Sequence, residues 1–230
     1  GRRINPTTES PLMKMPPVKT VEWIPRQPDC RYPGHLRLVD QTRLPLTLHM
    51  RDLHTAAEVW QAIQTLQVRG APAIGVAAAM GVVLGVQESG ATSLPAIRAT
   101  VEKTADFLAT SRPTAVNLFW ALDRMRRTAA DDRPPDALKT RLADEAVRIA
   151  EEDQAMCRAI GEQGAPLLQG IDSVLTHCNA GSLATAGYGT ALAPVYVACE
   201  QGRRLQVFAD ETRPLLQGAR LTAWELQQAG

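Results

Sequence analysis

The sequence has 230 residues, of which 45% are hydrophobic and only 4% are aromatic. This length allows one large domain or two smaller ones, with a core built mainly from aliphatic side chains. Lys and Arg number 25 against 24 Asp and Glu, which gives a formal net charge of +1. That balance excludes a chain-wide basic field, so we expect no nucleic-acid partner.

The spacing of cysteines and histidines argues against a metal site. The four cysteines are far apart in the sequence and the four histidines are dispersed, whereas structural zinc sites use closely spaced ligand pairs. There is no secretory apolar segment near the N-terminus, so a reducing cytoplasm is the expected location. The most apolar stretch, 71–86, is shorter than the roughly 20 residues that cross a bilayer, and we expect no membrane partner.

The first part of the chain is predicted to form a small domain of β-segments and helices. Residues 1–17 carry four prolines and no periodic apolar pattern, which predicts a flexible extension. The domain is expected to cover 18–130. Its β-type segments are predicted at 18–24, 36–39 and 46–50, separated by turn residues.

Four helices are predicted in the rest of this domain. Thr55 and Glu58 form a capping-box pattern at the start of the first, which ends before Arg69. Pro72 is suited to open the second helix and Ser93 to cap the third. The helices are predicted to begin near 55, 72, 95 and 115, and the last three to end near 84, 108 and 127.

A charged, proline-containing break at 131–135 is the predicted domain boundary. Beyond it, 131–230 is expected to hold a linker helix and the first part of a Rossmann-like domain, in the order of strands and helices that favours a parallel sheet. The elements expected there are a helix over 136–163, strands at 173–176 and 205–209, and helices at 191–199 and 219–228. Two parallel strands do not make a stable open sheet, so this α/β domain is expected to be truncated.

The run Thr-His-Cys-Asn-Ala-Gly at 176–181 is the strongest candidate for chemistry. A strand leads into it, and a small-residue loop leads from it toward a helix, which is how α/β proteins build anion sites. Cys178 lies at the carboxyl end of that strand, where such proteins collect reactive groups. The alternative is that Cys178 is a small buried hydrophobe, the commoner role of a lone cysteine.

Three further runs carry groups suited to an anionic substrate. Arg69 lies beside a Gly-Ala backbone at a helix start, and Arg112 lies at another helix opening. The third run, 208–218, brings acids, an arginine and Gln217 to the strand edge that also carries Cys178. Taken alone, the run at Arg69 could be an interhelix turn with a solvated arginine, and the run at Arg112 an ordinary helix-cap region. The run 208–218 could be a salt-bridged loop.

Together the four runs resemble the signatures of the 5-methylthioribose-1-phosphate isomerases of methionine salvage. That family is related to the regulatory subunits of translation initiation factor 2B. The runs are Arg-Gly-Ala-Pro-Ala-Ile-Gly, Ser-Arg-Pro-Thr-Ala-Val-Asn-Leu, Thr-His-Cys-Asn-Ala-Gly and Phe-Ala-Asp-Glu-Thr-Arg-Pro-Leu-Leu-Gln-Gly. They occur in unbroken order, and the resemblance covers about 21–226.

The resemblance implies both a reaction and roles for individual residues. The family converts an aldose 1-phosphate to a ketose 1-phosphate without a metal or organic cofactor, and a homodimer is expected. Cys178 matches the catalytic cysteine, which acts in proton transfer. The positions that match substrate-binding residues are Arg69, Gly70, Ala71, Arg112 and Gln217.

The chain departs from the family's pattern in one respect. In the family, the catalytic aspartate and an Asn-Lys pair that binds substrate lie in later strand–loop units. The sequence ends at Gly230, before those units, and Asp210 is not that aspartate because it belongs to the upstream Ala-Asp-Glu-Thr-Arg-Pro run. The 230-residue chain alone is therefore expected to be inactive. Two other functions remain open: a ribose-1,5-bisphosphate isomerase, and a non-catalytic regulatory protein like the initiation-factor relatives.

Overall fold

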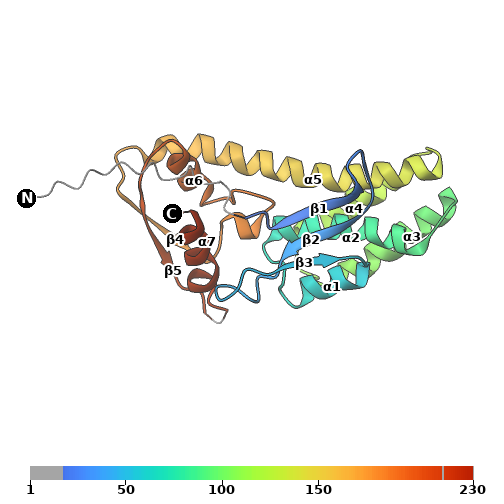
Figure 1. Cartoon of the computed structure of the whole chain (residues 1–230), viewed down its shortest axis with the longest axis horizontal. Helices are drawn as coiled ribbons and strands as arrows, with labels where there is room; N and C mark the ends of the chain where they lie inside the picture. Colours follow the sequence, from blue (N-terminus) through green and yellow to red (C-terminus); the bar gives the residue numbers. More distant parts are fainter. Residues whose placement is uncertain (1–17, 214, 230) are drawn as a thin grey trace, which may run out of the picture.

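A computed structural model describes residues 18–213 and 215–229, and the extension predicted for 1–17 lies outside this range. The described residues form a larger helical lobe with a small sheet and a smaller α/β lobe (Figure 1). A single 30-residue helix, α5 (Pro135–Gly164), runs along both lobes. The predicted α/β class is confirmed.

The sheet of the larger lobe is antiparallel, in the order β1 (Val21–Gln27), β2 (Cys30–Val39) and β3 (Met50–Leu53). The third strand predicted at 46–50 is wrong in position. Hydrogen-bonded turns carry the chain through that region, including one from Thr47 N–H to the Arg43 carbonyl, and Leu46 is 93% exposed. The residues that pair with β2 begin only at Met50, so the apolar alternation of Leu46 and Leu48 does not mark a strand.

Four helices complete this lobe: α1 (Ala56–Gln64), α2 (Ala71–Ser89), α3 (Leu94–Ala109) and α4 (Val116–Ala129). The predicted capping box of Thr55 and Glu58 is present, and Ser93 caps α3 as expected. Because these side chains accept bonds from otherwise unpaired N–H groups, they fix where the helices begin.

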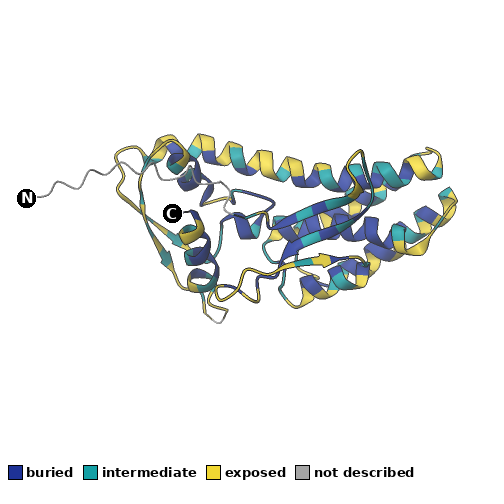
Figure 2. Ribbon diagram, viewed as in Figure 1, coloured by how far each residue is buried: buried dark blue, intermediate teal, exposed yellow. Residues whose placement is uncertain are grey.

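Helix α2 is the centre of the core. It is long and apolar enough to cross a membrane by length and composition, but 78% of the relevant window is buried inside the protein. Figure 2 shows it buried along its length, with α1, α3, α4 and α5 packed around it. A helix that is apolar all round and covered on every side is a core helix.

Helix α5 belongs to both lobes. Leu138, Leu142 and Ile149 from its first half lie in the same buried cluster as α2. Near its other end, Gly161 lies against α6 (Ala193–Glu200) so closely that an added Cβ would be 2.6 Å from Val197. The break at 131–135 is confirmed as the loop before α5, while a domain division at that point stays a prediction.

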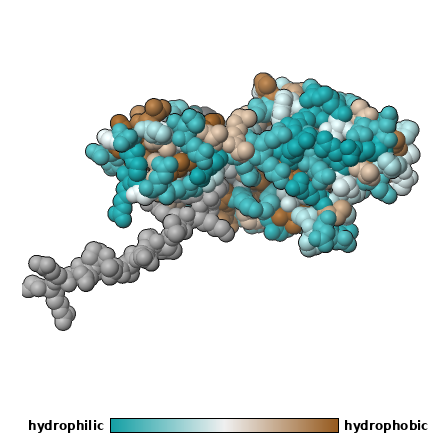
Figure 3. Space-filling model, turned by 90° about the horizontal axis from the view of Figure 1, so that it is seen from above, coloured by the Kyte–Doolittle hydropathy of each residue, from teal (hydrophilic) through white to brown (hydrophobic). Residues whose placement is uncertain are grey.

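The smaller lobe contains the predicted pair of parallel strands, β4 (Ser173–His177) and β5 (Gln206–Asp210), in direct register. Val174 and Val207 pack into the cluster beneath them, whereas Leu175 and Phe208 on the other face are 67% and 51% exposed. Apolar residues are conspicuous on this lobe in Figure 3. The remaining elements are the 3₁₀ turns η1 (Ala165–Leu168) and η2 (Ser182–Ala184), the π-helical turn η3 (Gly218–Thr222) and α7 (Ala223–Ala229).

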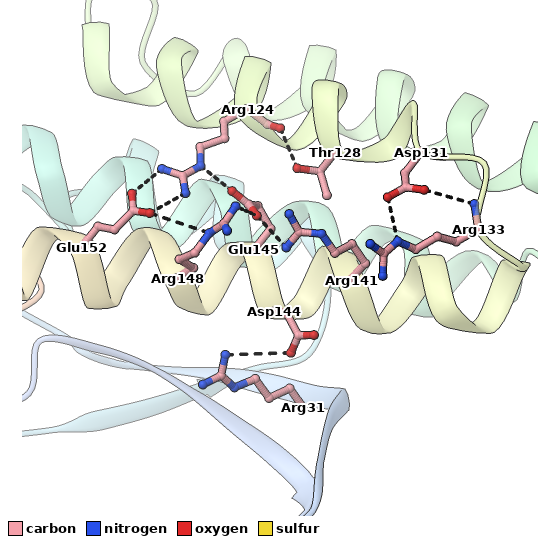
Figure 4. A network of polar contacts seen from close by, with 10 residues as sticks. All are labelled: Arg31, Arg124, Thr128, Asp131, Arg133, Arg141, Asp144, Glu145, Arg148 and Glu152. Carbon is pink, nitrogen blue, oxygen red and sulfur yellow. Dashed lines mark hydrogen bonds and ion pairs between the residues drawn. The ribbon is translucent and has the colours of Figure 1, made fainter.

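An ion-pair network joins α4 to α5 (Figure 4). The carboxylate of Glu145 is only 2% exposed and pairs with Arg124 at 2.5 Å, with Arg141 at 2.9 Å and with Arg148. Glu152 holds Arg124 from its other side at 2.5 Å. The network lines a hollow beside Trp120, but its arginines are largely occupied by these two carboxylates. Its role is therefore to hold the two helices together.

Candidate functional site

Two of the predicted site residues, Arg69 and Gln217, meet near the junction of the two lobes. Arg69 lies in the loop between α1 and α2, and Gln217 lies just before η3. With its amide oxygen turned toward Arg69, Gln217 accepts a hydrogen bond from Arg69 Nη2 at 2.7 Å and donates one to the Thr212 carbonyl at 2.9 Å. Two residues that the sequence placed in separate motifs are thus in direct contact.

The surroundings of Arg69 are electropositive. Burial lowers the pKa of its half-buried guanidinium, and the nearby charges of Arg220 and Arg112 act in the same direction. A thiolate at Cys178 would raise the pKa of Arg69 instead, which places the thiol within electrostatic range of the guanidinium. The Arg69 guanidinium is therefore within electrostatic range of two other arginines and of the Cys178 thiol, and such a cluster of positive charge favours a bound anion.

Gly70 allows the two lobes to approach each other at this point. Its φ of +90° is a conformation that side chains with a Cβ rarely adopt, and a Cβ there would lie 2.3 Å from the carbonyl oxygen of Ala184. Ala184 ends η2, the turn that follows the Cys178 loop. The backbone of the Arg-Gly-Ala run is therefore packed against the loop that carries the thiol. Ala71, the first residue of α2, is exposed.

We expect Gly70→Ala to separate these two segments and to destabilise the fold. The positive φ alone costs an alanine on the order of 1–2 kcal/mol, and the overlap with Ala184 adds to it. Gly90→Ala is the matched control, because Gly90 has a φ of +62° but nothing within 4 Å of an added Cβ. Urea unfolding of both variants measures the difference, and equal losses of stability would contradict the close approach.

Cys178 follows β4 directly and is partly accessible. Its φ is +62°, a left-handed conformation that is uncommon for a residue other than glycine and is often found at functional sites. By contrast, burial raises the pKa of the Cys157 thiol to about 11 and also raises the pKa of Cys199. Those two thiols are therefore poorly suited to acid–base or nucleophilic work near neutral pH.

Arg112 lies in the turn between α3 and α4 and is half-buried. Its carbonyl accepts a hydrogen bond from Ala115 N–H, which shapes the start of α4. Its guanidinium is within electrostatic range of Arg69. Arg69 is thus in contact with Gln217 and within electrostatic range of Arg112 and Cys178, while the joint site of the four residues stays a prediction.

One further arginine of this neighbourhood, Arg220, was not singled out in the sequence. Arg220 is anchored by the carbonyls of Leu44 and Thr42, and it carries a positive charge toward Arg69. Glu211, an acid of the third run, accepts bonds from the N–H groups of Thr212, Gly218 and Ala219, which hold its pKa below its usual value. That carboxylate caps a helix start and is not free to act as a base. The acids and arginines of 210–220 are the feature of the sequence that could have directed attention to Arg220.

The chemistry that this arrangement supports is limited and specific. Cations and an amide can hold a phosphate or sugar hydroxyls, and a partly accessible thiol beside them can exchange a proton with the substrate. Across the described ranges 18–213 and 215–229, no group of three or more His, Cys, Asp or Glu side chains is placed to hold a metal.

Comparison with known proteins gives one family match and several close relatives. Residues 67–230 match the model of the Initiation factor 2 subunit family. The chain is 57% identical over 199 residues to a 5-deoxyribose 1-phosphate isomerase of Moorella thermoacetica and 60% identical over 200 residues to a methylthioribose-1-phosphate isomerase of Rhodopirellula baltica. Both alignments cover 86% of this chain.

A solved structure agrees with these matches. The crystal structure of 5-methylthioribose 1-phosphate isomerase from Pyrococcus horikoshii OT3 superposes with a TM-score of 0.82 at 38% identity, over 95% of this chain and 59% of that one. The chain spans 57% and 56% of the length of the two relatives named above. The similarity therefore covers the described fold but only part of each relative.

Proposed function

Since the chain belongs to the Initiation factor 2 subunit family, we propose that it forms part of a sugar-phosphate isomerase that converts 5-methylthioribose 1-phosphate to 5-methylthioribulose 1-phosphate in methionine salvage. The observation that carries the proposal is the contact of Arg69 with Gln217, with Arg112 and the Cys178 thiol within electrostatic range of Arg69. A cationic group next to an accessible thiol suits a phosphorylated sugar that must exchange protons.

The proposed reaction moves hydrogen between C1 and C2 of an open-chain sugar. Because C1 carries the phosphate, the ring cannot open by loss of a free anomeric proton, so the site must protonate the ring oxygen or stabilise the charge that develops. In the proposal, Arg69 and Arg112 hold the phosphate and hydroxyl oxygens, the Gly70-Ala71 backbone approaches the substrate, and Gln217 orients Arg69. Cys178 acts in the proton transfer, and its partner acid–base group lies in the part of the relatives that this chain does not span.

A second substrate is favoured by a specific observation. One relative with 57% identity is named a 5-deoxyribose 1-phosphate isomerase. Both candidate sugars are uncharged at C5, which is a methyl carbon in 5-deoxyribose and bears a methylthio group in 5-methylthioribose, whereas ribose 1,5-bisphosphate carries a second phosphate there. The proposal therefore favours the first two sugars over the bisphosphate, and enzymatic activity over a purely regulatory role.

Steady-state assays of the full-length protein with the three sugar phosphates test this choice. We expect kcat/KM for the two sugars with an uncharged C5 group to exceed that for ribose 1,5-bisphosphate by at least about 100-fold, which corresponds to about 2.7 kcal/mol. The ratio of kcat/KM for 5-methylthioribose 1-phosphate to kcat/KM for 5-deoxyribose 1-phosphate shows which of the two is the better substrate. Turnover of the bisphosphate alone would assign the protein to the other isomerase class, and binding without turnover would support a regulatory role.

The proposal also covers the setting of the enzyme. We place it in the cytoplasm as a homodimer with no cofactor, and we expect a polypeptide limited to these 230 residues to be inactive. In that polypeptide Leu175 and Phe208 leave an apolar sheet face exposed, which favours association. Sedimentation of the full-length protein tests whether it is a homodimer. Turnover by the 230-residue polypeptide would contradict its expected inactivity.

A further inference from the structure

We propose that Thr222 and Glu225, which lie one turn apart near the end of the chain, are positioning residues that hold the Cys178 loop in its working geometry. This inference rests on the proposed role of Cys178. The two residues belong to η3 and α7, which pack under the loop from 178 to 183. Neither is placed to touch the substrate, because both are completely buried.

The carboxylate of Glu225 binds three groups of the loop. It accepts hydrogen bonds from Asn179 Nδ2 at 2.7 Å, from the Ser182 hydroxyl at 2.7 Å and from Leu183 N–H at 3.3 Å. Asn179 is the residue directly after the cysteine. One carboxylate therefore gathers both ends of the segment that begins at the thiol.

The hydroxyl of Thr222 acts on the cysteine itself. It donates a hydrogen bond to the Cys178 carbonyl and accepts one from Asn179 Nδ2 at 3.2 Å. The carbonyl so held belongs to the residue with φ of +62°. A left-handed conformation is unfavourable for a residue other than glycine and persists where surrounding contacts fix it. Thr222 supplies such a contact at the strained residue.

Gly181 shows that the loop is shaped around this carboxylate. A Cβ on Gly181 would lie 1.9 Å from Glu225 Oε1, so only glycine leaves room for the acid. On the other side, the backbone of Gly181 lies against Gly189, where an added Cβ would be 2.3 Å from the Gly181 Cα. The loop is therefore enclosed between α7 and its own returning segment.

The energetics of Glu225 favour a fixed loop. Burial raises the pKa of Glu225, while the bonds from Ser182, Asn179 and Leu183 N–H work in the opposite direction. The described residues provide no ion pair to this carboxyl group, so the loop itself supplies much of its compensation. Moving the loop would leave a buried acid without these hydrogen bonds, which is strongly unfavourable. Departure of Cys178 from its observed geometry is therefore opposed.

The test compares matched variants of Thr222 in the full-length enzyme. Thr222→Val keeps the shape of the side chain and removes the hydroxyl, whereas Thr222→Ser keeps the hydroxyl. We expect kcat of the valine variant to fall at least about 10-fold with KM changed less than about threefold, and the serine variant to recover most of kcat. Glu225→Gln should also lower kcat, because an amide cannot accept from all three donors. Gln227→Ala, on the exposed side of α7, should match the wild type.

A second readout does not depend on isomerase activity. The rate of alkylation of Cys178 by iodoacetamide, followed by mass spectrometry of its peptide, should change at least about threefold in Thr222→Val and return toward wild type in Thr222→Ser. If Cys178→Ser abolishes turnover while Thr222→Val changes neither kcat nor alkylation, the positioning inference is overturned. If alkylation changes as expected but Cys178→Ser retains full turnover, the inference about geometry stands and the catalytic role of the cysteine fails.

Discussion

Replacement of Cys178 by serine in the full-length enzyme should lower kcat by about 10²–10⁴-fold, while KM changes little. The serine hydroxyl is close in size to the thiol, so Arg69 and Gln217 keep their contact and the substrate still binds. A hydroxyl is a far weaker acid than a thiol and exchanges a proton poorly near neutral pH. The loss therefore falls on the chemical step, which steady-state kinetics separates from binding.

Cys30→Ser is the matched control for this substitution. Cys30 is the first residue of β2, where its sulfur contacts the Tyr32 carbonyl, and it belongs to neither the site nor the loop around it. Its replacement should leave kcat and KM unchanged. Near-normal turnover in Cys178→Ser would remove the cysteine from the mechanism.

Glu145→Ala should lower the free energy of unfolding by about 3–5 kcal/mol. Glu145 is 2% exposed and neutralises parts of three arginines, two of them on its own helix and Arg124 on α4. Removing the acid leaves Arg124, itself only 15% exposed, with Glu152 as its remaining ionic partner. The attachment of α4 to α5 weakens, and urea unfolding measures the loss.

The control for Glu145 is an exposed acid that pairs in a similar way. Glu102 is 59% exposed and bonds to Arg126 at 2.9 Å, so Glu102→Ala should cost no more than about 1 kcal/mol. A loss below 1 kcal/mol for Glu145→Ala would show that the buried network adds nothing to surface pairing.

The pH dependence of stability provides a second check on Glu145. Burial acts to raise the pKa of Glu145, but hydrogen bonds from Arg148 and Arg124 outweigh it and leave the pKa below its usual value. A carboxyl group whose pKa is lower in the folded state stabilises the fold above its unfolded pKa and loses that contribution as the pH falls through the folded value. The difference in the free energy of unfolding between wild type and Glu145→Ala should therefore shrink below about pH 4.

The elements best predicted from the sequence are those with local causes. Thr55, Glu58 and Ser93 act within one turn of their own helices, so their side chains alone indicate where α1 and α3 begin. The parallel pair β4 and β5 follows from the order of strands and helices, because such connections leave few topologies open. The misplaced third strand had no such local cause, since Leu46 and Leu48 alternate but face solvent.

The interior of the site could not be predicted in the same way. Arg69 and Gln217 meet only after both lobes have folded, and Asn179 finds Glu225 across 46 positions of the sequence. No periodicity or spacing encodes such a pair. A resemblance to known motifs indicated which residues to consider, but it gave no reason to single out Thr222 or Glu225.

The length of α5 limits how the site can admit its substrate. At about 1.5 Å per residue, its 30 residues form a rod about 45 Å long, and proline occurs only at its first position. One end of the rod is fixed in the larger core and the other lies against α6, so the lobes cannot swing apart as a jaw unless the rod bends. The junction at which Arg69 contacts Gln217 therefore keeps its geometry unless α5 itself deforms.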